Sequence, residues 1–298
     1  MQTLVLDLHE KFCNERLIIK NFTLATIKWY EVTFGLFLKA FPEIKSVDEV
    51  TTTRLQRFLY DGRIEKNWTA ATFITYYKGI KVFLDWCVKN GLLEKNPIDA
   101  IEKPKLEKRL PKRISKQDAM KLLDFALNKQ YRYRFEAFRN QAVIATFIYS
   151  GIRANELLCL RLKDVDLENN VIFVRLGKGN KDRVVPMCSP LKSCLRRYLD
   201  ERSRLKRNST HFFVSLRGDM PFTYSGLKKF VNNLKAVTGV NFSPHKLRHT
   251  FATLMLEGGC DLFSLQKMMG HSDIKTTTIY LSASVRLLQE QMLKHPLG

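Results

Sequence analysis

The sequence predicts a mainly helical protein of two domains, the second of which carries a small antiparallel sheet. Three observations predict this class. The chain has 298 residues, of which 45% are hydrophobic, which excludes disorder and suffices for about two domains at roughly 150 residues each. Apolar residues recur at helical spacing through most of the sequence. Two short β-branched runs flank a glycine-rich turn, which is the pattern of a β-hairpin.

Residues 1–102 are predicted to form a helical bundle. Apolar side chains recur at helical spacing from Thr23 to Phe41 and more regularly from Phe73 to Cys87. Turn-forming residues are expected to separate the helices, and short polar residues to cap them. The expected breaks are Pro42, Asp61-Gly62 and Asn90-Gly91, and the expected N-caps are Ser46 and Asn67.

Residues 103–113 are predicted to be a basic linker. The helical periodicity stops here, and Pro104 and Pro111 stiffen the segment and disfavour helix. Its cations are suited to lie along an anionic partner. They are Lys103, Lys105, Lys108, Arg109, Lys112 and Arg113.

Residues 114–298 are predicted to form a second domain that is mainly helical. Ser115 is a suitable N-cap for helical patterns that run to Ser150. Residues 171–174 and 183–186 are then expected to pair as a hairpin with its tip at 177–181. A third strand is expected at 211–214, followed by helices from Thr223 to the carboxyl end.

The charge of the chain favours a polyanionic partner. Fifty Lys and Arg against 29 Asp and Glu give a formal charge of +21, and the most abundant cytosolic polyanion is nucleic acid. A protein that is merely basic is the alternative. We expect no transmembrane helix, because the apolar run from Ala142 to Ile152 is too short to span a membrane. We also expect no signal peptide, because Asp7 and Glu10 stand where a signal peptide has a basic region and then an apolar one. The six scattered cysteines predict neither a disulfide framework nor structural zinc, so a cytoplasmic protein is expected.

Arg153 and Lys178 are the first two candidates for chemistry. Gly151 is expected to end one helix and Arg153 to open the next, where a guanidinium and helix N-terminal amides would bind a phosphate. A surface arginine paired with Glu156 is the alternative. Lys178 lies in the hairpin tip, which does not match a nucleotide-binding phosphate loop. It is either a solvated lysine or a proton donor that reaches into a groove.

Two further segments combine histidines with other reactive groups. His245 and His249 have the spacing of a zinc pair, but Lys246 and Arg248 stand between them and would repel a dication. We therefore expect His245 and Arg248 to face an anionic substrate and His249 to be a buried structural residue. His271 follows a glycine that ends a helix, and Tyr280 stands nine residues later. A tyrosine oxygen attacks phosphorus when nearby cations stabilise the phenolate.

Taken in order, these segments resemble the tyrosine recombinase family of phage-integrase and Xer-like enzymes. The family signature is an Arg, a Lys on a β-hairpin, His-x-x-Arg, Gly-His and then a Tyr. The matching residues are Arg153, Lys178, His245, Arg248, His271 and Tyr280. The motifs cover about residues 112–298, whereas the first domain resembles the family's core-binding domain only in size, helicity and placement. The resemblance implies a mixed, mostly helical catalytic domain with a small antiparallel sheet.

The resemblance also implies a mechanism without metal or other cofactor. Tyr280 would attack a DNA phosphorus to give a 3′-phosphotyrosine and a 5′-hydroxyl, with Arg153 and Arg248 on the non-bridging oxygens. His271 would add a hydrogen bond, Lys178 would protonate the leaving oxygen and His245 would help to accept the tyrosine proton. Glu156 would orient the cations. The linker cations named above and Lys181 are the expected DNA contacts.

Strand exchange through a Holliday junction implies a homotetramer or heterotetramer on paired double-stranded sites. The amphipathic stretch 285–293 would dock on a neighbouring protomer, unless it caps its own domain. An activating protein is a possible further partner, and a cytoplasmic, nucleoid-associated enzyme is expected. Xer-type dimer resolution and mobile-element integration both remain open. The rival functions are a type IB topoisomerase, a telomere-resolving enzyme and a DNA-binding protein without catalysis. His245 and Gly270-His271 argue against the first, the generally larger size of such enzymes against the second, and the complete set of candidate residues against the third.

Overall fold

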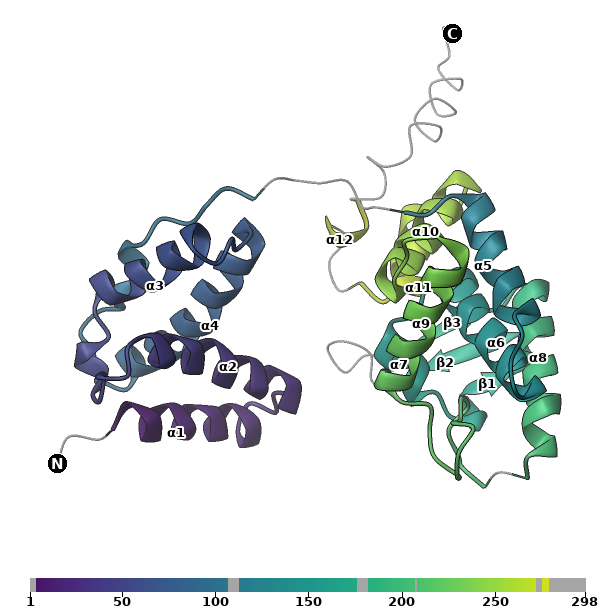
Figure 1. The fold of residues 1–298 in the computed structure, drawn as a ribbon, viewed down its shortest axis with the longest axis horizontal. Helices are drawn as coiled ribbons and strands as arrows, with labels where there is room; N and C mark the ends of the chain where they lie inside the picture. Colours follow the sequence, from purple (N-terminus) through teal and green to yellow (C-terminus); the bar gives the residue numbers. More distant parts are fainter. Residues whose placement is uncertain (1–3, 107–112, 176–181, 207, 272–274, 279–298) are drawn as a thin grey trace, which may run out of the picture. The chain divides into compact units, whose positions relative to one another are not determined.

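The computed structural model describes residues 4–106, 113–175, 182–206, 208–271 and 275–278. The chain divides into two compact units, which we call unit 1 (Met1–Lys108) and unit 2 (Arg109–Gly298) (Figure 1). No helix within the described ranges has both the length and the apolar character that crossing a membrane requires.

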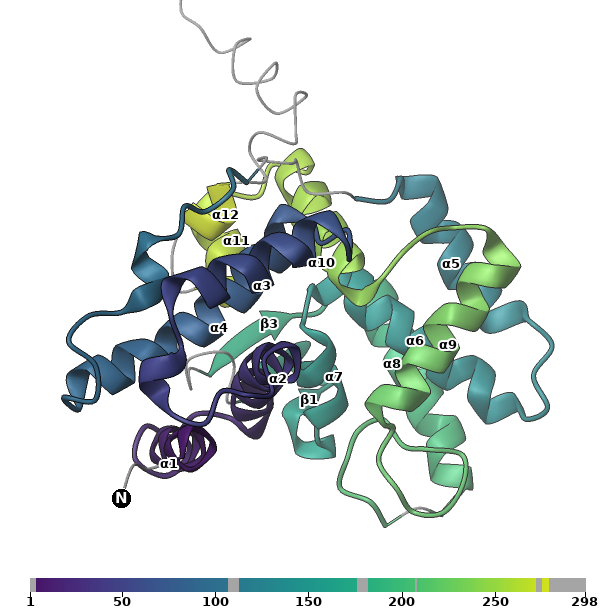
Figure 2. The ribbon, with the colours of Figure 1, turned by 60° about the vertical axis from the view of Figure 1, so that its left-hand side comes forward.

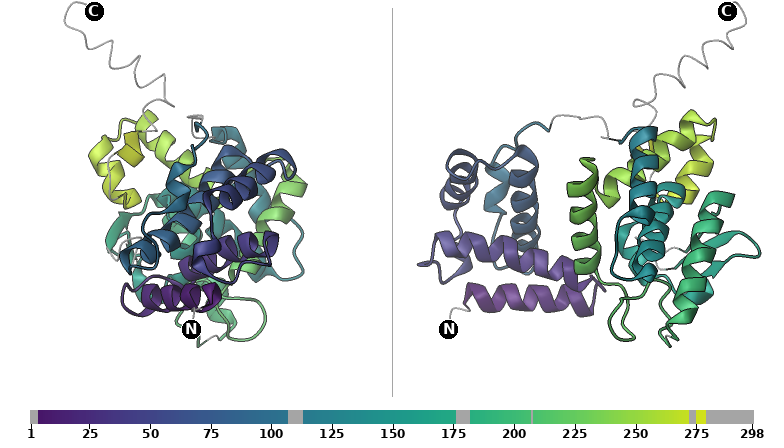
Figure 3. Two further views of the ribbon diagram at one scale, coloured as in Figure 1. Left: turned by 90° about the vertical axis from the view of Figure 1, so that its left-hand side faces the viewer. Right: turned by 45° about the vertical axis from the view of Figure 1, so that its right-hand side comes forward.

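Unit 1 is a bundle of four α-helices with two short 3₁₀ helices. Helix α2 packs against α1 and α4, and α1 and α2 run side by side in Figure 3. Three of the helices begin after a threonine whose hydroxyl accepts the N–H three residues on, which satisfies an amide that the helix leaves unpaired. The elements are α1 (Val5–Ile18), α2 (Leu24–Ala40), η1 (Val47–Glu49), α3 (Thr52–Ile64), α4 (Ala70–Lys89) and η2 (Pro97–Ala100).

The core of unit 1 is built from aromatic rings. Phe83 of α4 lies 4.6 Å from Phe34 of α2 and 5.5 Å from Phe12 of α1, measured between ring centroids. Such tilted ring pairs add stabilisation beyond the burial of apolar area. The rings therefore fasten three helices to one another. Both long helical patterns predicted from the sequence are helices of this core.

Two predicted boundaries in unit 1 are wrong. Asp61-Gly62 lies inside α3, and a Cβ on Gly62 would lie 2.3 Å from the Trp68 ring, so this glycine permits close packing rather than a turn. Asn67 has a φ of 52° and precedes the N-cap, which is Thr69. The predicted break at Asn90-Gly91 is confirmed, because α4 ends at Lys89 with Asn90 as its C-cap. The aperiodic stretch that follows contains η2, whose Ile98 is buried in the core. Ser46 is confirmed as an N-cap, that of η1.

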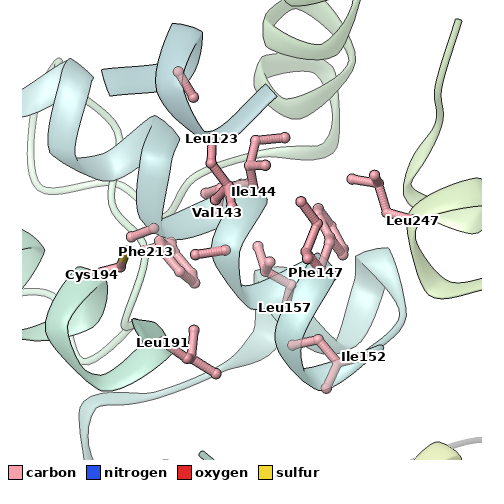
Figure 4. Packing of buried hydrophobic residues seen from close by; sticks show 14 of the residues in the cluster. Leu123, Val143, Ile144, Phe147, Ile152, Leu157, Leu191, Cys194, Phe213 and Leu247 are labelled. Carbon is pink, nitrogen blue, oxygen red and sulfur yellow. The ribbon is translucent and has the colours of Figure 1, made fainter. Parts of the chain in front are cut away.

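Unit 2 is arranged around one buried helix, α6. This helix packs against α5, α8 and α10, and its segment 142–148 is buried throughout because apolar or small residues face all sides. Figure 4 shows Val143, Ile144 and Phe147 of α6 within this core. The helices are α5 (Lys116–Asn128), α6 (Arg134–Ser150), α7 (Ala154–Cys159), η3 (Leu162–Asp164), α8 (Ser189–Arg204), α9 (Tyr224–Thr238), α10 (Pro244–Glu257), α11 (Leu262–Met269) and α12 (Lys275–Thr278).

The small sheet has the order β1-β2-β3 and is antiparallel. Strands β2 (Val171–Val174) and β3 (Arg183–Pro186) pair as the predicted hairpin, with Val174 opposite Arg183. The third strand is β1 (Val165–Asp166) and not the predicted segment 211–214, which makes only isolated bridges. Val214 donates its N–H to the Tyr198 hydroxyl, which donates to the Phe212 carbonyl. A side chain thus satisfies the backbone that a strand partner would otherwise pair.

One end of unit 2 brings several elements together. Helix α11 packs against α10, β3 and α12 (Figure 2). The turns that end α6 and α11 are both glycines in the left-handed conformation, Gly151 with a φ of 60° and Gly270 with a φ of 64°. These are the two helix ends that the sequence predicts, and both are confirmed.

Candidate active site

Gly151 allows the end of α6 to approach α10. A Cβ at this position would lie 2.2 Å from the Phe251 ring, so a side chain would push the two helices apart. The Gly151 carbonyl accepts a hydrogen bond of 2.5 Å from Nη1 of Arg248. The turn therefore places Arg153, two residues later, close to an arginine almost a hundred residues away in sequence.

Arg153 is the N-cap residue of α7, as predicted. Its backbone N–H donates to Oε2 of Glu156 at 2.7 Å, and its Nη1 donates to Oε1 at 2.8 Å. Nη2 reaches the Gly270 carbonyl at 3.3 Å. The side chain keeps 29% of its surface exposed. The pairing with Glu156 and a position suited to an external anion are therefore both present.

Arg248 is buried at the ends of two helices. Only 3% of the residue is exposed, and besides Gly151 its guanidinium donates to the Met269 carbonyl at 2.6 Å. The C-terminal carbonyls of a helix carry partial negative charge, which stabilises a cation there. Ser243 and Pro244 start α10 as predicted, and this start fixes the register that directs Arg248 inward.

His271 follows the left-handed Gly270 and is held from both sides. Its Nδ1 lies 2.8 Å from the hydroxyl of Thr277 on α12, and its carbonyl accepts from Nε2 of Gln266. Burial, followed by the charges of Arg248 and Arg153, lowers the pKa of His271 to about 4. The imidazole is therefore neutral near pH 7.

His245 lies on the first turn of α10 and is exposed, in contrast to Arg248. Burial of part of its ring and the nearby charges of Arg248 and Arg153 lower its pKa. Its ring meets that of His249 edge-on, with 4.4 Å between centroids. His249 was predicted to be buried and is half-buried. No three His, Cys, Asp or Glu side chains are grouped to hold a metal ion anywhere in the described ranges.

Glu156 receives a second arginine that the sequence analysis missed. Arg183 of β3 donates from Nη1 to Oε1 at 3.0 Å and from Nη2 to Oε2 at 2.7 Å. Burial alone would raise the pKa of Glu156, but the hydrogen bonds and charges of Arg183 and Arg153 lower it to about 2. Strand alternation holds a signal for this contact, because Arg183 shares the face of the buried Val185.

The remaining candidates are placed as follows. Lys103 lies over the Tyr77 ring at 5.2 Å, Lys105 is exposed, and Arg113 pairs with Glu257 at 3.0 Å. Six candidates lie outside the described residues: Lys108, Arg109, Lys112, Lys178, Lys181 and Tyr280.

The described residues bring together Arg153, Arg248 and His271, with His245 beside them, although they come from separate parts of the chain. Two guanidiniums with one neutral imidazole can bind a tetrahedral oxyanion through directional hydrogen bonds. Such donors stabilise charge that develops on a phosphorus centre during transesterification.

Residues 112–286 match the model of the Phage integrase family. The chain belongs to the phage integrase family. This integrase is 33% identical to Tyrosine recombinase XerC of Corynebacterium glutamicum over 96% of its own length and 91% of that protein. It is 29% identical to Tyrosine recombinase XerD of Oceanobacillus iheyensis, over 92% of each chain. It is a Xer-like tyrosine recombinase, a DNA strand-exchange enzyme, as the sequence motifs predict.

Solved structures agree with this assignment of the integrase. The XerH site-specific recombinase bound to palindromic difH substrate matches with a TM-score of 0.73 and 25% identity, over 95% of this chain and 82% of that chain. The Tn1549 transposon integrase, in complex with a circular intermediate DNA, matches with a TM-score of 0.74 at 19% identity, over 98% and 100% of the two chains. The second likeness concerns the fold alone. None of these matches favours the alternative of a protein without catalysis.

Proposed function

We propose that this recombinase cleaves and rejoins the DNA backbone at the cluster formed by Arg153, Arg248 and His271. One observation carries the proposal. The guanidiniums of Arg153 and Arg248 are both anchored on the carbonyls that end α11, and His271 follows directly. Anchored donors need little reorganisation when an oxyanion forms, which is the condition for stabilising a transition state.

The reaction is a transesterification. The Tyr280 oxygen attacks phosphorus, a new P–O bond to tyrosine forms, and the bond from phosphorus to the 5′-oxygen breaks. The tyrosine proton passes to His245, whose lowered pKa leaves the ring neutral and able to accept it. Lys178 supplies a proton to the leaving 5′-oxygen. Attack by a second strand's 5′-hydroxyl on the phosphotyrosine reverses these steps and joins the new partner.

Glu156 is assigned an orienting role in this mechanism. With a pKa of about 2 it is ionised near pH 7 and cannot serve as an effective general base there. Its two oxygens hold the backbone N–H and the guanidinium of Arg153. This pairing fixes the direction in which Arg153 presents its other N–H groups.

The substrate in this proposal is double-stranded DNA with paired recombination sites. Unit 1, the basic linker 103–113 and unit 2 would contact the duplex mainly through phosphates, which position the protein. Exchange between two duplexes requires four active sites, so a homotetramer or heterotetramer assembles through the segment 285–293. Similarity to XerC and XerD over most of the chain favours a Xer-type role over mobile-element integration, and an activating partner is compatible with either.

The test is to trap covalent adducts. Purified protein is incubated with fragmented host DNA that carries random nicks. The reaction is stopped with denaturant, and the DNA that remains covalently attached to the protein is sequenced. We expect adducts at one core sequence, and their loss in Tyr280→Phe with non-covalent affinity retained. Unchanged adducts in the variant would refute the nucleophile, whereas binding without adducts even after addition of host extract would favour a DNA-binding protein that lacks catalysis.

A further inference from the structure

The segment that ends α11 accepts hydrogen bonds from three arginines that come from three different elements. Met268 accepts from Nε of Arg183 at 2.8 Å, Met269 from Arg248 at 2.6 Å, and Gly270 from Arg153 at 3.3 Å. We call Arg153, Arg183 and Arg248 the arginine cluster. The carboxylate of Glu156 binds two members of this cluster, Arg153 and Arg183.

Arg183 differs from the other two members of the cluster in what its guanidinium contacts. Both Nη atoms bind Glu156, and Nε binds Met268. Each nitrogen of this guanidinium thus has a partner within the protein, and only 8% of the side chain is exposed. Arg153 keeps 29% exposed. Arg183 is therefore placed to act on other residues and not on a bound phosphate.

The turn after α11 is shaped around Arg183. A Cβ on Gly270 would lie 2.9 Å from Cδ of Arg183 and 3.0 Å from its Nη1. The guanidinium consequently lies against the bare backbone immediately before His271. The same side chain touches the turn that carries His271 and the carboxylate that orients Arg153.

Charge balance gives this arrangement a function. If Arg153 were the single cationic partner of Glu156, the carboxylate would attract the Arg153 guanidinium strongly. It would then offset the positive charge with which Arg153 binds a phosphate. A second cation on Glu156 shares that negative charge, and the bidentate geometry is the one that arginine and carboxylate favour. Breaking a buried pair by removing one partner leaves the other charge uncompensated.

We propose that Arg183 is a positioning residue for strand cleavage: it balances the charge of Glu156 so that Arg153 stays available to the phosphate. This inference rests on the cleavage activity proposed above. It requires that Arg183 matters for cleavage only while Glu156 carries its charge. A residue that merely fastens β3 to α7 would not show this dependence.

The experiment is a double-mutant cycle on the rate of covalent adduct formation, using nicked duplexes that carry the recovered core site. The variants are Arg183→Met, Glu156→Gln and the combination of both. We expect Arg183→Met to slow cleavage about 100-fold with an unchanged Kd for DNA, since many phosphates share the binding. In the Glu156→Gln background the same change is expected to slow cleavage no more than about threefold.

Two further variants control for folding and for general loss of charge. Arg183→Lys keeps the cation without the bidentate fork, and we expect cleavage within about tenfold of the wild type. Arg204→Met removes an exposed arginine that pairs with Glu201 on α8, and we expect no change. Thermal unfolding of each variant shows whether it is folded. If Arg183→Met does not fold, Arg183→Lys and the double variant still test the inference.

The outcomes separate this inference from the proposed function. Equal losses for Arg183→Met with and without Glu156→Gln would overturn the inference and leave Arg183 with a purely structural role. Cleavage by Arg183→Met at the wild-type rate would overturn it as well. If the wild-type chain itself forms no adduct, the proposed function fails, and this inference fails with it.

Discussion

Two of the buried polar centres in the described residues, one in each unit, are stabilised in opposite ways. In unit 1, His9 is 7% exposed between Phe34 and Phe83, and its Nε2 has no hydrogen-bond partner within the described residues. Burial lowers the pKa of His9 to about 4, so the ring is buried without charge. In unit 2, arginines cannot lose their charge at ordinary pH, and carbonyls and a carboxylate compensate them instead.

The difference distinguishes a polar group that the core of unit 1 tolerates from a group of residues to which we assign a function. A histidine in an aromatic core becomes neutral at the cost of one unpaired nitrogen. The arginine cluster has partners at the ends of α6 and α11 and on α7, and its members Arg183 and Arg248 come from β3 and α10. It therefore connects these elements to one another. Cationic donors that are held in place by several contacts need little reorganisation when they bind an anion.

The largest expected effect is on Arg248, the most buried member of the cluster. Arg248→Ala removes the donor to Gly151 and Met269 and the charge that we propose to act on the phosphate, so we expect adduct formation to fall about 100- to 1000-fold. Denaturing gels after a fixed reaction time measure this loss. Adduct yields within threefold of the wild type would show that Arg248 serves only the fold.

A pair of glycines tests how closely the cluster is packed. Gly239 and Gly270 both end helices with positive φ, 70° and 64°, but a Cβ on Gly239 would meet nothing within 4 Å. We expect Gly239→Ala to cost about 1 kcal/mol of unfolding free energy from backbone strain. Gly270→Ala is expected to cost about 2 kcal/mol more, because its Cβ would meet Arg183. Equal melting temperatures for the two variants would contradict the close packing.

The third prediction concerns the stability of unit 1 at acid pH. The folded-state pKa of His9 lies below its ordinary value, so the unfolded chain binds more protons between about pH 6.5 and 4, and stability is lost as the pH falls through this window. We expect protonation of His9 to lower the free energy of unfolding by roughly 2 kcal/mol when the pH falls from 7 to 5. Urea unfolding of wild type and His9→Phe at both pH values measures it.

Tryptophan fluorescence makes this measurement specific to unit 1, because Trp29, Trp68 and Trp86 all lie there. It thereby excludes the titration of His249 and His271 in unit 2. If His9→Phe shows the same pH dependence as the wild type, other groups cause the loss of stability at acid pH.

The smallest effect is expected for an exposed cation outside both centres. Lys105 is exposed in the linker, so Lys105→Ala should weaken DNA affinity less than about threefold and reduce the slope of log affinity against log salt by about one. For the wild type we expect affinity to fall on the order of a thousandfold between 50 and 200 mM salt. Fluorescence anisotropy across a salt series measures both. A DNA affinity that does not change with salt concentration would contradict binding through phosphate contacts.

Sequence alone determined the parts of this protein that depend on local pattern. Helical spacing located α2 and α4, β-branched runs located the hairpin, and glycines located the ends of α6 and α11. The motifs identified the family because their residue types and order match its signature. Propensity and periodicity act within a few residues of one another, which is why these predictions held.

Tertiary structure decided what depends on contacts between distant residues. Gly62 is buried beneath Trp68 within a helix instead of forming a turn, and the segment 211–214 pairs with Tyr198 instead of a strand. The role of Arg183 was equally hidden, since its partners Glu156 and Met268 stand 27 and 85 residues away. Only folding brings such groups within hydrogen-bond distance, and burial then gives the contact its strength, because water no longer competes for either partner.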